Sequence, residues 1–241
     1  LLTTAHRLGL RVFIDLVPNH FSWDHPLFQA ALTAAPGSPE RELYYFRDGR
    51  GGNGDLPPNN WGSMFGGPAW SRTTNPDGTP GQWYLHMFDV SQPDWNWDNP
   101  AVPALFDDVL RFWFDRGVDG FRIDVAHSLI KVTDLRDQIR DSDDRTAPIL
   151  TDEGALVDPH VEDEPMWDQS EVHDIYRDWH RVLAAYPGDR MTVAEAWTRT
   201  PESMARYVRP DELSQSFNFA WLSTGWSAEA FRQVIEDTFS A

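Results

Sequence analysis

The chain has 241 residues, 41% of them hydrophobic and 24% charged, which is the composition of one large globular domain. Its formal net charge of −18 repels phosphate, and no apolar run reaches the roughly 18 residues of a membrane span, so we expect neither nucleic acid nor a membrane as a partner. The lack of cysteine excludes disulfides and thiolate metal sites, whereas twelve tryptophans fit either core packing or a sugar-binding cleft.

The first residues have the pattern of the last turns of a helix. Residues 1–10 carry one apolar stripe, and Gly9 is a typical helix end. Because the chain has no initiating methionine and starts within this pattern, we expect its true N-terminus to be missing. Residues 10–17 then form a short β-rich run that is apolar on both faces, which is typical of a buried parallel strand.

Residues 21–98 have a different character. They are rich in Gly, Pro, Asn and Trp, with turn signals at Pro57-Pro58, Gly66-Gly67 and Asp77-Gly78, and no helical period runs through them. The segment is too long for a plain loop. It predicts a small irregular subdomain inserted after the first strand.

Beyond residue 98 the predicted helices and strands alternate. Asn99-Pro100 opens a helix that Gly117 ends, and Thr200-Pro201 and Ser227 open two others. The first of these helices has the apolar stripe Val102, Leu105, Phe106, Val109, Phe112 and Trp113. In chain order we predict a strand at 118–125, a short helix near 127–140, an acidic loop at 141–169, a helix at 172–183, a strand at 191–196, a helix at 200–208, a strand at 213–219 and a last helix.

This alternation predicts an α/β fold with a parallel sheet, either doubly wound or a (β/α)8 barrel. No Gly-rich phosphate loop follows a strand, which argues against the nucleotide-binding doubly wound fold. Four strand–helix units would make half of a barrel.

Three predicted strands carry acids near their carboxyl ends: Asp15, Asp124 and Glu195. Barrel active sites are built at this end of the strands, so the three side chains would converge. Glycoside cleavage needs one carboxylate as nucleophile and one carboxylic acid to protonate the leaving oxygen. The alternative is that each acid caps a helix or lies in solvent.

Cations and histidines near these acids suggest further roles. Arg122 lies two residues before Asp124 and therefore on the same face of the strand, where it either orients a nucleophile or forms a structural ion pair. His20 follows the first strand and could bond a sugar hydroxyl or simply be exposed. No HExxH spacing occurs, so we expect no zinc. Lys131 is the only lysine, which we attribute to coding bias.

Three motifs resemble the signatures of the α-amylase family of glycoside hydrolases, in the family's order. They are Asp15-Leu-Val-Pro-Asn-His20, Gly120-Phe-Arg-Ile-Asp-Val-Ala-His127 and Thr192-Val-Ala-Glu-Ala-Trp197. The stretches from Asn59-Asn60-Trp61-Gly62 to Trp70, Trp83 to Phe88 and Gln92 to Trp97 are similar to the α-glucosidase and oligo-1,6-glucosidase branch.

The resemblance implies a fold and a role for each matched residue. Residues 1–20 and 99–241 would form about strands 3 to 6 of a (β/α)8 TIM barrel, and residues 21–98 an inserted, domain B-like subdomain. Asp124 would be the nucleophile and Glu195 the acid and base. The substrate-binding residues would be Asp15 and His20 at the terminal glucose, Arg122 holding the nucleophile, Phe88 on the acceptor side, Val125 where α-1,6 bonds are tolerated, and His127 near the leaving sugar. Packing in the barrel is the alternative for Val125.

The chain departs from the family pattern in one important respect. The family's third catalytic carboxylate follows the seventh strand in a His-Asp signature, and these 241 residues have no counterpart of it. We therefore expect the chain alone to be inactive. Some members bind a structural calcium in an N-terminal region that would precede this chain, and otherwise the resemblance implies no metal and no organic cofactor.

The expected full-length protein is a cytoplasmic, retaining, exo-acting α-glucosidase. It would release terminal glucose from short malto- or isomalto-oligosaccharides. The first alternative is a trehalose synthase or transglucosidase of the same family. The more distant alternative is a non-catalytic barrel homologue that acts as a binding subunit.

Overall fold

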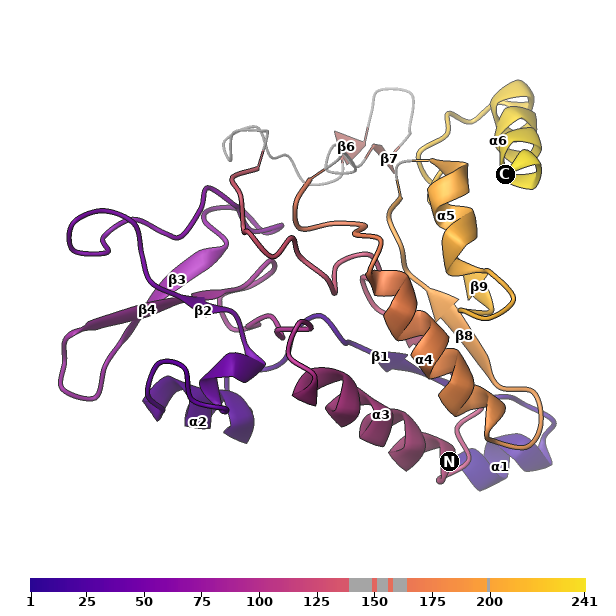
Figure 1. The fold of residues 1–241 in the computed structure, drawn as a ribbon. Coiled ribbons are helices and arrows are strands. Elements are labelled where there is room, and N and C mark those ends of the chain that lie inside the picture. Colours follow the sequence, from indigo (N-terminus) through magenta and orange to yellow (C-terminus); the bar gives the residue numbers. More distant parts are fainter. Residues whose placement is uncertain (139–148, 151–155, 158–163, 199) are drawn as a thin grey trace.

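The computed structural model describes residues 1–138, 149–150, 156–157, 164–198 and 200–241. Their helices and strands alternate along most of the chain (Figure 1). The helices are α1 (Leu2–Arg7), α2 (Pro26–Thr33), the 3₁₀ helix η1 (Arg41–Leu43), α3 (Ala101–Phe114), α4 (Val172–Ala184), α5 (Pro201–Tyr207) and α6 (Ala228–Ser240). The strands are β1 (Phe13–Leu16), β2 (Phe46–Arg47), β3 (Trp70–Thr74), β4 (Pro80–Leu85), β5 (Gly120–Ile123), β6 (Ile149–Leu150), β7 (Leu156–Val157), β8 (Met191–Ala194) and β9 (Gln215–Ser216).

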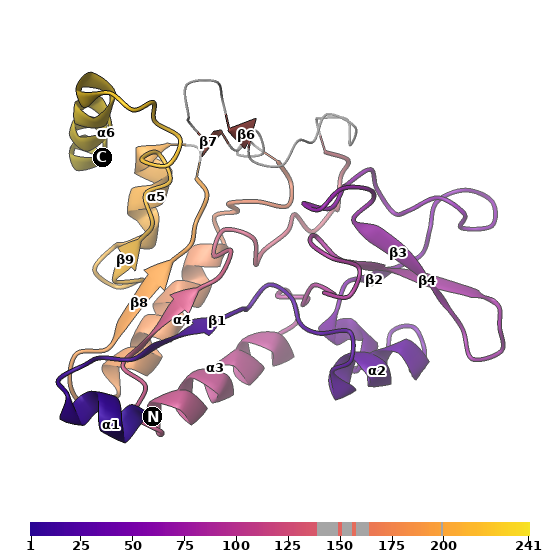
Figure 2. The same ribbon diagram turned by 180° about the vertical axis from the view of Figure 1, so that it is seen from behind.

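Four strands form a parallel sheet in the order β1-β5-β8-β9. Helices α3 and α4 lie on one side of it, and the opposite view shows the strands in front of these helices (Figures 1 and 2). The α/β class and the four predicted strands of a partial barrel are therefore confirmed. Each strand is shorter than predicted, so Asp124 and Glu195 follow β5 and β8 directly instead of ending them.

The segment between β1 and α3 contains its own antiparallel sheet, with the order β2-β4-β3. It lies to one side of the parallel sheet, beside α2 (Figure 1). The segment also contains the short helix α2, although no helical period runs through its sequence. Pro26 occupies the first turn of α2, and the His25 ring accepts the N–H of Leu27 at its start. Two capping signals thus produce a helix too short to show a clear period.

Helix α3 buries a narrower stripe than predicted. Its buried residues are Val102, Phe106, Leu110 and Phe114, which repeat every four residues and face the sheet. Phe112 and Trp113, which the prediction placed in the stripe, are exposed. The predicted helix at 172–183 is confirmed as α4, and it buries the apolar residues Val172, Ile175, Tyr176, Trp179, Val182 and Leu183.

The helix predicted near 127–140 does not form over residues 127–138, and residues 139 and 140 lie outside the described part. The N–H of Val132, which a helix would direct to the carbonyl of Ser128, donates instead to the carbonyl of Pro165 at 2.9 Å. Leu135, with φ of 48°, also interrupts a right-handed helix. Within the predicted loop at 141–169, β6 and β7 form a short antiparallel pair, and much of the rest lies outside the described residues.

The predicted starts of the two C-terminal helices are confirmed. Thr200 accepts the N–H of Ser203 at 3.2 Å, and Ser227 accepts that of Ala230 at 3.1 Å. Across the described ranges, none of the helices has the length and apolar character that crossing a membrane requires.

Candidate active site

The register of the parallel sheet brings the predicted site residues to one edge. Asp15 of β1 lies opposite Arg122 of β5, and Leu16, Ile123 and Ala194 form the next row. Asp124 and Glu195 follow this last row on neighbouring strands. Their main chains continue the hydrogen bonding of the parallel sheet. Asp124 N–H donates to Leu16 O at 2.9 Å, and Glu195 N–H donates to Ile123 O at 2.8 Å.

The guanidinium of Arg122 bridges the two carboxylates expected to be catalytic. Its Nη1 lies 2.6 Å from Asp124 Oδ1, and its Nη2 lies 2.5 Å from Glu195 Oε2. Nη1 also lies 3.4 Å from Asp15 Oδ1, although Asp15 is 63% exposed and its contact is accordingly weaker. Burial alone would lower the pKa of Arg122, but Glu195 and Asp124 outweigh it and raise that pKa. Arg122 is thus a fixed cation between the acids.

Glu195 has the environment of a carboxylic acid. Burial raises its pKa, and the neighbouring Asp124 carboxylate raises it further. The N–H of Val125, 3.1 Å from Oε2, and the charge of Arg122 act in the opposite direction. The net shift is upward, which favours a proton on Glu195 at a pH where an ordinary glutamate is ionised.

His20 and Phe88 pack together, and His20 is near enough to Asp124 for the charge of that carboxylate to act on its ring. Their ring centroids are 4.9 Å apart, so the insertion and the loop after β1 meet here. The His20 ring nitrogens are 3.3 Å from Asn19 Nδ2 and 3.2 Å from Gln92 Nε2. Burial lowers the pKa of His20, which keeps the imidazole neutral near pH 7. The His20 ring is therefore neutral and fixed by two side-chain amides.

Lys131 lies directly behind this part of the site. Its ammonium is 2.9 Å from Asp94 Oδ2 and 2.6 Å from Asn19 Oδ1. With the Ser128 carbonyl, these oxygens provide an acceptor for each of its three protons. The ammonium thus links the loop after β1, the insertion and the loop after β5. The sequence interpretation missed this residue, and the signal was a single lysine within the apolar run Ser128-Leu-Ile-Lys-Val132.

The structure places Val125 and His127 beside the main chain of the acid rather than in the open. Val125 is buried and adopts a positive φ of 38°. His127 is also buried, and its Nδ1 accepts the N–H of Trp197 at 3.4 Å. Burial lowers the pKa of His127 to about 3, so it is neutral. His127 therefore contacts the segment that carries Glu195, whereas its predicted contact with a leaving sugar is untested.

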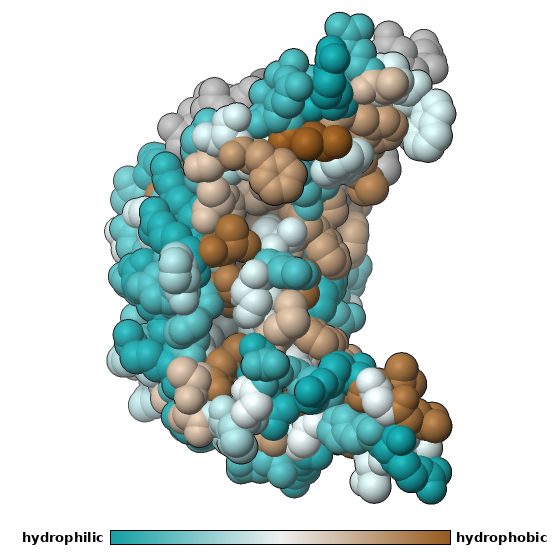
Figure 3. Space-filling model, turned by 90° about the vertical axis from the view of Figure 1, so that its right-hand side faces the viewer, coloured by the Kyte–Doolittle hydropathy of each residue, from teal (hydrophilic) through white to brown (hydrophobic). Residues whose placement is uncertain are grey.

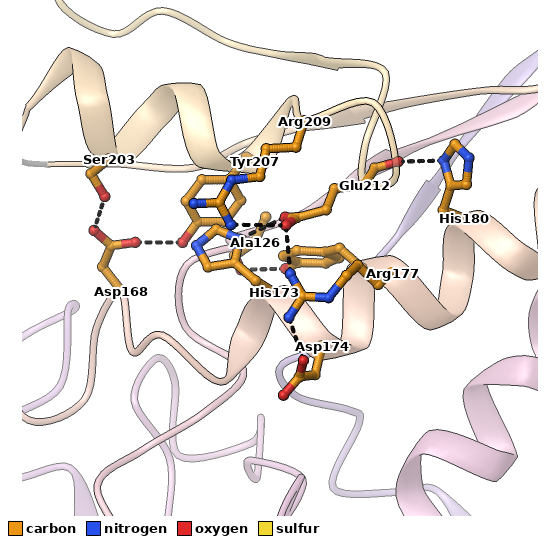
Figure 4. A network of polar contacts seen from close by, with 11 residues as sticks. Ala126, Asp168, His173, Asp174, Arg177, His180, Ser203, Tyr207, Arg209 and Glu212 are labelled. Carbon is orange, nitrogen blue, oxygen red and sulfur yellow. Dashed lines mark hydrogen bonds and ion pairs between the residues drawn. The ribbon is translucent and has the colours of Figure 1, made fainter. Parts of the chain in front are cut away.

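A polar network supports the site from the side of α4 (Figure 4). The buried carboxylate of Glu212 lies 2.6 Å from His173 Nδ1 and 2.9 Å from Arg177 Nη1, both on α4. Asp168 Oδ1 accepts a hydrogen bond from the hydroxyl of Tyr207 at 2.6 Å, which joins α5 to the segment before α4. The buried Glu212 and the half-buried Asp168 therefore join α4 and α5 to the segments next to them, and sequence patterns alone gave no sign of these pairings.

The network reaches the acid through one further residue of α4. The hydroxyl of Tyr176 donates to the carbonyl of Ala126. The N–H of Ala126 in turn donates to the carbonyl of Glu195 at 2.7 Å. The loops after β5 and β8 are thus fixed to each other and to α4.

The chemistry that this arrangement allows is acid and nucleophilic catalysis by two carboxylates. In the part of the chain that the structure describes, no cluster of three or more His, Asp or Glu side chains could hold a metal ion. Asp124 beside Arg122 suits a nucleophile, and the pKa of Glu195 suits a proton donor. Arg122, Asp124 and Glu195 are brought together as the sequence predicted, Asp15 contacts Arg122, and His20 near Asp124 packs on Phe88.

Comparisons with known proteins give related sequences and folds. The family described as alpha amylase, catalytic domain, matches residues 1–238. An oligo-1,6-glucosidase of Bacillus sp. (strain F5) is 35% identical over 222 residues, covering 91% of this chain and 39% of the relative. A trehalose-6-phosphate hydrolase of Bacillus subtilis (strain 168) is 34% identical over 229 residues, covering 94% and 36%.

Among solved structures, the crystal structure of an alpha-glucosyl transfer enzyme, XgtA, has a TM-score of 0.83 and 32% identity to this chain. The match covers 99% of this chain and 43% of that protein. The chain therefore spans less than half the length of each of these three proteins.

Proposed function

The chain belongs to the alpha-amylase family of glycoside hydrolases, and we propose that the full-length enzyme is a retaining, exo-acting α-glucosidase. It would release terminal α-linked glucose from short malto- or isomalto-oligosaccharides. The observation that carries the proposal is the bridge of Arg122 between Asp124 and Glu195, at 2.6 and 2.5 Å. Similarity to oligo-1,6-glucosidases supports the choice of glucoside.

The proposed reaction is a double displacement. Glu195 transfers its proton to the glycosidic oxygen as the bond from that oxygen to C1 of the glucose breaks. The Asp124 carboxylate forms the new bond to C1 from the opposite face. Water then attacks C1, gives a proton to Glu195 and releases Asp124. Two inversions return the original anomer, and the two side chains perform these steps without an organic cofactor.

The remaining residues would bind the sugars. We assign Asp15 and His20 to the terminal glucose, since His20 is neutral and lies beside the acids. Phe88 of the insertion would form the wall on the acceptor side, because its ring packs on His20. In this proposal residues 1–20 and 99–241 form the catalytic part of a barrel, and residues 21–98 a subdomain that closes over the substrate.

The test uses two variants of the full-length enzyme. Asp124→Asn should reduce the turnover of maltose and of nitrophenyl α-glucoside by about 10⁴-fold or more, because no nucleophile remains. Glu195→Gln should lose maltose turnover but keep a fast first step with nitrophenyl α-glucoside, whose leaving group needs no proton. Both variants should unfold at temperatures close to that of the wild type.

Two results would contradict the assignment. An Asp124→Asn enzyme with a tenth of wild-type activity would exclude the proposed nucleophile. Equal losses on good and poor leaving groups in Glu195→Gln would exclude the proposed acid. A well-folded wild-type enzyme without activity on any glucoside would instead favour the non-catalytic binding subunit.

A second function, glucosyl transfer, is favoured by the similarity to the alpha-glucosyl transfer enzyme. The chemistry up to the Asp124 intermediate is the same, and a sugar hydroxyl replaces water in the second step. Incubation of the full-length enzyme with maltose distinguishes the two. Glucose as the only product supports hydrolysis, whereas trehalose or longer glucosides would identify a trehalose synthase or transglucosidase.

A further inference from the structure

Val125, directly after the proposed nucleophile, adopts an unusual backbone conformation. Its φ is 38°, in the left-handed region, and it is the one β-branched residue among the three non-glycine residues with positive φ in the described ranges. Such a conformation costs a β-branched residue free energy and persists only where surrounding contacts enforce it. The contacts of this turn therefore indicate what the conformation serves.

The turn directs two successive N–H groups to Glu195. Val125 N–H donates to Oε2 of its side chain at 3.1 Å, and Ala126 N–H donates to its carbonyl at 2.7 Å. The N–H and hydroxyl of Ser128 both donate to the Val125 carbonyl, at 2.9 and 2.6 Å, and hold the turn. The Val125 N–H thus faces the side-chain carboxylate of Glu195, and the Ala126 N–H faces the main chain of the same residue.

These contacts determine which oxygen of Glu195 can carry a proton. Oε2 receives two donors, the N–H of Val125 and Nη2 of Arg122, the latter at 2.5 Å. A carboxyl oxygen with both lone pairs used in this way has no room for a proton, and a proton there would point at two donors. The transferable proton must therefore lie on Oε1.

We propose that the main-chain N–H of Val125 is a positioning group for the general acid: it holds Oε2, assigns the transferred proton to Oε1 and stabilises the carboxylate that remains. The proposal rests on the proposed function of Glu195. When Oε1 gives its proton to the glycosidic oxygen, the electrons of the O–H bond stay on the carboxylate. The Val125 N–H strengthens its hydrogen bond to that anion.

The charged and titratable groups around Glu195 come from several elements. The backbone substitution at Val125 described below changes none of these side chains. Arg122 and Asp124 face it from β5 and the residue after it, and Asp15 reaches Arg122 from β1. His20 and His127 are neutral near pH 7, because burial lowers the pKa of each. Removal of the Val125 N–H alone should therefore raise the pKa of Glu195, because the ionised carboxylate loses one hydrogen-bond donor.

The experiment replaces Val125 of the full-length enzyme with its α-hydroxy acid analogue, which keeps the side chain and converts the N–H into an ester oxygen. We expect kcat/KM for maltose to fall about 10- to 100-fold, the scale of a hydrogen bond to a charged group. The alkaline limb of the pH profile should move to higher pH. Nitrophenyl α-glucoside, which needs no proton, should lose much less.

The matched control is the same ester at Ala126, which removes an N–H bonded to the Glu195 carbonyl instead of its side chain. It should lower stability without moving the alkaline limb. The proposal would be overturned if the alkaline limb of the pH profile did not move in the Val125 ester, or if kcat/KM fell equally for maltose and nitrophenyl α-glucoside.

A measurement on the unaltered backbone covers the case in which the ester does not fold. In selectively ¹⁵N-valine-labelled enzyme, the Val125 amide signal should titrate with Glu195, and this titration should disappear in Glu195→Gln. A Val125 amide that does not respond would refute the proposal. Because this readout needs no turnover, it is separable from a failure of the proposed α-glucosidase activity.

Discussion

Lys131 and Asp94 form an ion pair at 2.9 Å in which neither side chain keeps any exposed surface. The two residues belong to different parts of the chain, one in the loop after β5 and the other in the insertion. Asn19, which touches both, precedes His20. This pair therefore fixes the insertion against the loop that carries a proposed substrate-binding residue.

We expect Lys131→Met to destabilise the full-length enzyme by about 3–5 kcal/mol, because Asp94 would remain buried without its partner. KM for maltose should also rise, since Asn19 and His20 lose their support. Chemical unfolding and steady-state kinetics measure the two effects. The matched control is Arg136→Met, which breaks an exposed pair with Asp134 and should cost less than about 1 kcal/mol. Similar losses in both variants would show that the buried pair has no special role.

The contrast between Asp124 and Lys131 explains how much could be predicted from the sequence. The strands and the acids that follow them were predictable because a buried apolar run and its end are local patterns. The partners of Lys131 lie 37 and 112 residues away, at Asp94 and Asn19, so no local pattern contains the pair.

The errors in the secondary structure have the same origin. The segment after Val125 has helical periodicity, but the N–H of Val132 donates to the distant carbonyl of Pro165, and Lys131 pairs with Asp94 of the insertion. Tertiary contacts thus outweighed local propensity. Similarly, the exposure of Phe112 depends on which neighbours pack on α3, and periodicity alone does not specify them.

Buried, neutral His127 should make the enzyme sensitive to acid. Its pKa of about 3 lies below the ordinary value of 6.5, so below pH 6.5 the unfolded chain binds a proton that the folded chain does not. This contribution to stability is complete above pH 6.5 and is lost as the pH falls towards 3, at up to about 1.4 kcal/mol per pH unit. His127→Asn keeps an acceptor for Trp197 and does not titrate. The stability difference between the two proteins should therefore change across this range, and a constant difference would contradict the prediction.

Val125 also supports a prediction about linkage preference. If Val125 lines the acceptor side, as the proposed function implies, its β-branched side chain beside Asp124 would narrow that side, and the full-length enzyme should hydrolyse isomaltose as well as maltose. Val125→Ala, which removes the β-branched side chain, should shift the ratio of the two kcat/KM values towards maltose. Val102→Ala, a buried truncation in α3, is the control and should lower stability without changing the ratio. If the ratio is unchanged in Val125→Ala, the side chain only packs in the fold and does not set the linkage preference.

The last prediction concerns the 241 residues expressed by themselves. Trp226 and Phe239 are 91% and 88% exposed, and an apolar groove of about 940 Å³ runs between β1 and α3, lined by Phe112 and Trp113 among others. On the face shown in Figure 3, which has a crescent outline, hydrophobic residues lie exposed among hydrophilic ones. With β1 at the edge of its sheet, this surface favours self-association.

We expect the isolated chain to elute from size exclusion as a broad, large species and to show no activity on nitrophenyl α-glucoside, since the family's third carboxylate has no counterpart in it. The double variant Trp226→Ser and Phe239→Ser should elute later, because it removes the two most exposed rings. Ser substitution at buried Phe106 is the matched control and should not reduce association. A monodisperse, cooperatively melting and active monomer would mean that these residues form a complete catalytic site and that their exposed apolar surface does not drive association.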